Sequence, residues 1–117
     1  MAELIVKSKI KEVAKDFNIA GDFADALDKW AIEQINAAIK RADANGRKTL
    51  QAKDVYIGNG VAKEMLIVKS KIKDFAKNHN VAGDFAEALN EVVTQSIIQA
   101  CERAKANGRR TIQARDL

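Results

Sequence analysis

The sequence predicts an all-α protein, and three observations support that prediction. Proline is absent, charged residues make up 31% of the chain and aromatic residues only 5%, a composition that suits helices. Apolar residues recur at helical spacing through two long runs. These runs belong to a segment that occurs twice, so the second half repeats the organisation of the first. A chain of 117 residues is long enough for one ordinary domain.

The repeat has an offset of 62 residues. Residues 4–11 (LIVKSKIK) recur unchanged at 66–73, and 30 of the 52 positions aligned from there onward are identical. Two copies are too few for a solenoid and the period is too long, so we interpret the repeat as one small fold present twice. Copy 1 is assigned to residues 1–57 and copy 2 to residues 66–117. Residues 58–65, which contain a Gly-Asn-Gly turn, are assigned as the linker.

Each copy is predicted to contain a short helix, a loop, a long helix, a second loop and a very short helix. We expect Ser8 and Ser70 to cap the short helices and Asp22 and Asp84 to cap the long ones, because their side-chain oxygens can accept hydrogen bonds from free amides. The first loops are expected at residues 18–21 and 80–83, and the first long helix at about residues 23–44.

The long helices carry apolar stripes that would face each other. A half of about 55 residues buries little apolar surface alone, so two halves with crossed long helices would share one core. The expected stripes are Phe23, Ala26, Leu27, Trp30, Ile35, Ala38, Ile39 and Ala42 in the first helix, and Phe85, Ala88, Leu89, Val92, Val93, Ile97, Ala100, Cys101 and Ala104 in the second.

A loop motif follows each long helix: residues 44–54 (ANGRKTLQAKD) return as residues 106–116 (ANGRRTIQARD). Asn-Gly ends a helix, because glycine adopts the left-handed conformation without steric cost. The two cations and the hydroxyl that follow are side chains that often bind phosphate. The arginine and the aspartate seven residues later could pair across the loop, which gives the pairs Arg47–Asp54 and Arg109–Asp116.

Residues 47–55 (RKTLQAKDV) resemble the second loop and the start of the third helix of the histone fold. The chain looks most similar to short bacterial and archaeal histone-like proteins, in which the third helix is about one turn long, and the resemblance covers nearly the whole chain in two copies. It implies a tandem histone doublet packed as a handshake pseudo-dimer. It also implies that both Arg–Asp pairs are internal clamps and that Lys48, Thr49, Arg110 and Thr111 face DNA.

Two departures from core histones argue against nucleosome-like wrapping. The first loops carry no arginine, and the third helix is very short in both copies.

The short helices supply a further set of candidate DNA contacts. Their lysines, with Ser8, Ser70 and the free helix N-termini, would meet phosphate, although a solvated lysine face remains an alternative for about half of them. The complete set of candidate DNA-binding residues is Lys7, Ser8, Lys9, Lys11, Arg47, Lys48, Thr49, Lys69, Ser70, Lys71, Lys73, Arg109, Arg110 and Thr111. We expect a third group of cations on the long helices to be solvated: Lys29, Lys40, Arg41, Arg103 and Lys105.

The sequence has a mild excess of positive charge and no pattern that indicates targeting. The net charge of +4 and the pI of about 9.3 permit a polyanionic partner. No basic segment followed by an apolar core, as in a signal peptide, opens the sequence, and no apolar run reaches the roughly 20 residues of a membrane span. A single cysteine excludes an internal disulfide. We therefore expect a cytoplasmic, nucleoid-associated protein.

The sequence gives little support for catalysis. The only histidine, His79, is expected half out of the core, and Cys101 lies on an apolar stripe. We expect no enzyme activity, metal, cofactor, small-molecule substrate or membrane partner. The favoured function is binding of double-stranded DNA without sequence preference, as an architectural protein that is a monomeric pseudo-dimer in solution. The alternative is a histone-fold protein–protein assembly module without direct DNA binding.

Overall fold

The computed structural model describes residues 4–55, 66–76 and 78–117, except for the side chain of Lys7. The first half contains α1 (Lys7–Ala14), β1 (Asn18–Ile19), α2 (Gly21–Ala44), β2 (Thr49–Leu50) and the 3₁₀ turn η1 (Ala52–Asp54). The second half repeats this order with α3 (Lys69–Ala76), β3 (Asn80–Val81), α4 (Gly83–Ala106), β4 (Thr111–Ile112) and η2 (Ala114–Asp116). The predicted all-α class and element order are confirmed, while the linker assigned to residues 58–65 lies outside the described residues.

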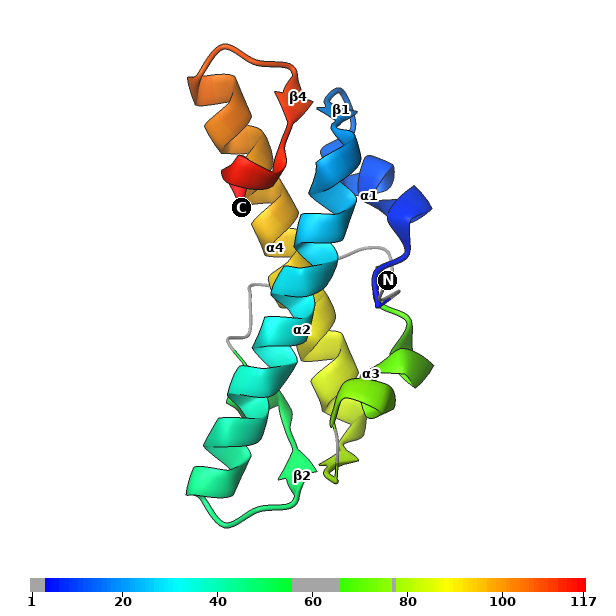
Figure 1. Cartoon of the computed structure of the whole chain (residues 1–117), viewed down its shortest axis with the longest axis vertical. Helices are drawn as coiled ribbons and strands as arrows, with labels where there is room; N and C mark the ends of the chain where they lie inside the picture. Colours follow the sequence, from blue (N-terminus) through cyan, green and yellow to red (C-terminus); the bar gives the residue numbers. More distant parts are fainter. Residues whose placement is uncertain (1–3, 56–65, 77) are drawn as a thin grey trace.

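The core runs along the crossed long helices α2 and α4 and beneath the short elements packed on them (Figure 1). Phe23 and Leu27 from α2 and Phe85 and Leu89 from α4 have no solvent-accessible surface, and the short helices add further buried apolar side chains. The predicted stripes are largely right, although a few of their members are only partly buried against this core: Trp30, Ile39, Val92 and Cys101. The core thus draws on both halves, as two small repeats that must share one apolar interior require.

Short strands of one half also pair with short strands of the other half. β1 pairs in parallel with β4, with Asn18 opposite Thr111, and β2 pairs in parallel with β3, with Thr49 opposite Asn80. The first loop of each half therefore lies beside the cation-bearing loop of the other half. These two paired-loop ends lie at opposite ends of a molecule 46 Å long (Figure 1).

The starts of α1 and α3 lie side by side. Ile5 and Ile67 form an antiparallel bridge, and the Val6 amide donates to the carbonyl of Leu66 at 2.7 Å. This pairing keeps the chain extended up to Val6, which is the N-cap of α1 and makes no side-chain capping bond.

The expectation that serines cap the short helices is therefore wrong. Ser8 lies inside the first turn of α1, and Ser70 is likewise the second residue of α3.

The expected aspartate caps of the long helices are also wrong, because these side chains serve the other half of the molecule. α2 begins at Gly21, so Asp22 lies in its first turn and not at the cap. Its Oδ1 instead accepts from the Ala114 amide at the start of η2, at 3.3 Å. The equivalent Asp84 Oδ1 accepts from the Ala52 amide of η1 at 3.2 Å. Each 3₁₀ turn is thus capped by the long helix of the opposite repeat.

Candidate nucleic-acid interface

The cation-bearing loops owe their shape to the helix ends before them. α4 ends at Ala106, and Gly108 follows with a φ of +69°, a left-handed conformation that glycine adopts without strain. The Gly108 amide donates to the carbonyl of Lys105, and the Arg109 amide donates to the carbonyl of Ala104 at 2.8 Å. This pair of bonds is a Schellman motif, and the bonds around Gly46 (φ +70°) repeat it after α2. Each loop therefore leaves its helix in one fixed direction.

An arginine–aspartate pair closes each loop. The guanidinium of Arg109 places Nη2 2.7 Å from Oδ1 of Asp116 and Nη1 2.9 Å from Oδ2. The guanidinium of Arg47 binds Asp54 in the same bidentate way, at 2.6 and 2.9 Å. Each arginine also donates to the carbonyl of the loop threonine two residues on. The two predicted ion pairs are therefore present, and they tie loop and 3₁₀ turn together.

The aspartates of these pairs are almost fully buried, and their environment favours the ionised form. Hydrogen bonds from Arg109 lower the pKa of Asp116 from its usual 3.8 to about 2, although burial acts in the opposite direction. Hydrogen bonds from Arg47 likewise lower the pKa of Asp54. The amides of Gln51 and Gln113 each donate to the second carboxylate oxygen at 2.8 Å. A charge held by three donors stabilises a loop rather than attracting a ligand.

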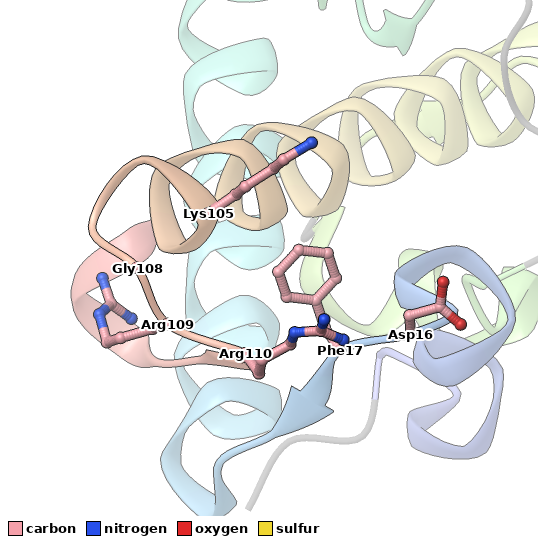
Figure 2. A pocket seen from close by; sticks show the side chains of 6 residues that line it. All are labelled: Asp16, Phe17, Lys105, Gly108, Arg109 and Arg110. Carbon is pink, nitrogen blue, oxygen red and sulfur yellow. The ribbon is translucent and has the colours of Figure 1, made fainter.

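The second cation of each loop has no such structural task. Lys48 and Arg110 are exposed, and among the described residues they bond through their backbone carbonyls, which accept from the amides of Asn80 and Asn18 at 2.7 Å. Thr49 and Thr111 are half-buried within β2 and β4. At the β1–β4 end, Arg110 lines a cavity of about 390 Å³. Figure 2 shows Phe17 between the side chains of Lys105 and Arg110, with Asp16 on the α1 side.

The opposite end is closed by a different set of side chains. His79 occupies the position equivalent to Phe17, and its Nε2 lies 2.7 Å from Oδ1 of Asp43, which is equivalent to Lys105. His79 is only 6% exposed, so the expectation that it lies half out of the core is wrong. Its position at the junction of the two halves, with Asp43 as partner from α2, explains the burial. The two ends therefore differ in chemistry although their backbones correspond.

The first-helix candidates divide into two kinds. The Nζ of Lys11 donates to the carbonyl of Phe17, and the Nζ of Lys73 donates to the carbonyl of His79, both at 2.6 Å. These two lysines therefore hold the first loops, a role that their sequence position did not indicate. The side chain of Lys7 lies outside the described residues and Lys9 is half-buried. The remaining candidates on these helices are exposed: Ser8, Lys69, Ser70 and Lys71.

The sequence did not indicate two sets of hydrogen bonds that side chains of the long helices form. Arg41 donates from Nη1 to the backbone carbonyl of Asp54, and Arg103 does the same to Asp116, so these two arginines are not simply solvated. Each lines a cavity at the outer side of its loop. Asp28 accepts from the amides of Leu4 and Ile5 at 2.9 and 3.0 Å, and its partners lie more than 20 residues away. No short-range spacing could have revealed such contacts.

The described residues also bear on a metal site, a reactive cysteine site and a membrane-spanning segment. Among residues 4–55, 66–76 and 78–117, no group of three or more His, Cys, Asp or Glu side chains could hold a metal ion. Cys101 is half-buried, and burial raises the pKa of its thiol, which leaves it less reactive. None of the helices in these ranges is long and apolar enough to cross a membrane.

Comparison with known proteins is informative for the structure and not for the sequence. The sequence matches no protein-family model and no curated protein. Among solved structures, the chain is similar to the histone from Methanopyrus kandleri, with a TM-score of 0.62 and 20% sequence identity over 96% of this chain and 89% of that chain. At this identity the likeness establishes the fold alone: this chain consists of two histone folds, each with a short, a long and a very short helix, packed in a handshake.

Proposed function

We propose that this protein binds double-stranded DNA without sequence preference and acts as an architectural, nucleoid-associated protein. The observation that supports this most directly is the arrangement of the two paired-loop ends. Each end presents an exposed loop cation, Lys48 or Arg110, whose side chain bonds to no described residue, and the molecule is 46 Å long. A turn of B-DNA spans roughly 34 Å, so phosphates about one turn apart come within reach of both ends.

The starts of α1 and α3 supply a third contact region between these ends. Because Ile5 and Ile67 are paired, the two helix N-termini lie together on one flank of the molecule. Helix N-termini favour anions through their free amides and their dipoles. The exposed Lys69 and Lys71 add positive charge there, and Ser8 and Ser70 add hydroxyl donors. One duplex could therefore meet three positive regions in succession.

Sequence preference is not expected from this surface. The first loops present Asn18 and Asn80 and no arginine, so a long side chain that could enter a groove is missing at those positions. Affinity should instead come from phosphate contacts and the release of counterions. If about four to six phosphates are contacted, log K against log salt should slope near −4 to −5.

A salt titration with a matched pair of variants tests the proposal. Lys48→Ala with Arg110→Ala removes the two loop cations, and at about 0.15 M salt the loss of two phosphate contacts should weaken binding roughly thirtyfold. The salt slope should also fall by about two, equally for unrelated duplexes. Lys29→Ala with Lys40→Ala removes the same charge from exposed long-helix positions and should change affinity much less. A wild-type slope near zero would favour the assembly-module alternative instead.

A further inference from the structure

The structure contains a second cationic site at each end of the molecule, separate from the exposed loop cation. After α4, a cavity of about 480 Å³ is lined by Arg103, Asn107, Arg109, Arg115 and Asp116. After α2, a cavity of about 540 Å³ is lined by the equivalent residues Arg41, Asn45, Arg47, Lys53 and Asp54. The same arrangement of three cations, one amide and one carboxylate thus occurs twice.

The carboxylate does not neutralise these cavities. Asp116 is 2% exposed and its oxygens are taken up by Arg109 and the Gln113 amide. With one negative and three positive side chains, each cavity has a net charge of +2. Within the described part of the chain, the guanidinium of Arg103 is held by one bond to the carbonyl of Asp116, which leaves its other N–H donors available. Asp22, from the long helix of the other half, has one oxygen on the Ala114 amide of η2.

Lys53 and Arg115 are exposed members of the two cavities, as are Arg41 and Arg103. Neither Lys53 nor Arg115 forms a hydrogen bond or an ion pair with any described residue, and both belong to 3₁₀ turns whose geometry is fixed by the neighbouring aspartates. They therefore project charge from a rigid backbone, and their charges also help to lower the pKa values of Asp54 and Asp116.

The long-helix cation that lines the cavity beside η2 points away from Lys105, although Arg109 borders the cavities on both sides. Arg103 and Lys105 are two residues apart on α4, which turns about 100° per residue, so they point about 200° apart. Lys105 lines the cavity that Arg110 borders, whereas Arg103 lines the cavity beside η2. In Figure 1, α1 lies on one side of the crossed long helices and η2 lies across them on the other side. A duplex bound on the α1–α3 flank would therefore leave the cavity beside η2 uncovered.

We propose that the two cavities bind the phosphates of a second DNA segment, so that one chain bridges two duplexes. This inference rests on the proposed function, since it assumes that the α1–α3 flank and the paired loops hold the first duplex. Guanidinium groups fixed by a carboxylate and a carbonyl form planar, pre-positioned donors, which suit phosphate oxygens.

A capture assay separates the two claims. One duplex is immobilised, the protein is added, and recovery of a second, fluorescent duplex of unrelated sequence is measured at about 0.15 M salt. Lys53→Ala with Arg115→Ala removes about one phosphate contact per cavity, two in all, so recovery of the second duplex should fall roughly thirtyfold. Affinity for a single duplex should stay within about twofold of that of the control, Lys29→Ala with Lys40→Ala, which has the same net charge.

The possible results differ clearly. Recovery by the Lys53→Ala/Arg115→Ala variant equal to that of the control would overturn the second site. A wild-type protein that binds one duplex but recovers no other would overturn bridging and leave the proposed function standing, as expected if the cavities receive an acidic protein segment. A wild-type protein that binds no duplex at all would overturn both. Reduced recovery with unchanged single-duplex affinity supports the inference.

Discussion

Replacement of Asp116 by alanine should cost the protein a large share of its stability. The carboxylate is 2% exposed and accepts bonds from Nη1 and Nη2 of Arg109 and from the Gln113 amide. Its pKa of about 2, against a usual 3.8, corresponds to roughly 2 kcal/mol of stabilisation of the folded state by the ionised carboxylate. Removal also leaves the Gln113 amide without its partner, so we expect a loss of about 2–3 kcal/mol.

Thermal unfolding followed by circular dichroism measures this loss. For a chain of this size, 2–3 kcal/mol corresponds to a decrease in Tm of roughly 10 °C. Asp74→Ala, which removes an exposed carboxylate from α3, is the matched control and should leave the Tm within about 2 °C of wild type. If Asp116→Ala unfolds at the same temperature as this control, the ion pair does not stabilise the loop and the argument fails.

The lowered pKa of Asp116 also predicts how the stability of the protein changes at acidic pH. A carboxyl group whose folded pKa lies below its unfolded pKa stabilises the protein above the unfolded value and loses that contribution as the pH falls through the folded value. For Asp116 the loss should therefore occur between about pH 4 and pH 2, and Asp54, whose pKa is also lowered, should add to it. Urea unfolding of wild type and of Asp116→Asn should show a difference in stability that narrows across this window. A difference that stays constant down to pH 2 would contradict the assignment.

Three further predictions follow from the fold. Gly108→Ala places a side chain at a φ of +69° and should cost about 1 kcal/mol, measured by urea unfolding. Asp28→Ala leaves the amides of Leu4 and Ile5 without their acceptor and should lower the free energy of unfolding by about 2 kcal/mol. Asp28→Asn should lower it less, because Asn90 accepts from an amide at the equivalent position of the second half. The isolated chain should scatter light as a monomer of 12.8 kDa, because the second copy already supplies the handshake partner; a stable dimer would contradict this.

The elements that depend on local chemistry could be predicted from the sequence. Helical spacing gave both long helices, and Asn-Gly marked their ends, because glycine at a φ near +70° is a local requirement. The Arg47–Asp54 pair could also be predicted, since its partners are only seven residues apart and lie in one loop. Each of these features depends on a few neighbouring residues.

The errors arise where a local signal competed with a distant partner. Ser8 follows the usual capping pattern, but pairing of Ile5 with Ile67 sets the start of α1 two residues earlier. Asp22 also fits a cap, yet its oxygen meets the Ala114 amide, 92 residues away. Short-range rules assume that a polar side chain serves its own helix. In a handshake of two repeats, the nearest unsatisfied amide often belongs to the other repeat.

Duplication within one chain allows the two ends of the handshake to differ. At one end Phe17 lies beside the cavity lined by Lys105 and Arg110, and at the other the equivalent positions hold His79 bonded to Asp43. In a dimer of identical chains, a lysine-to-aspartate change in the long helix would appear at both ends together. In this chain the change at one end is matched by a histidine partner, and the other end keeps its cation. The backbone pairing of β1 with β4 and of β2 with β3 is the same at both ends, so the fold constrains the loops while leaving their charge free to vary.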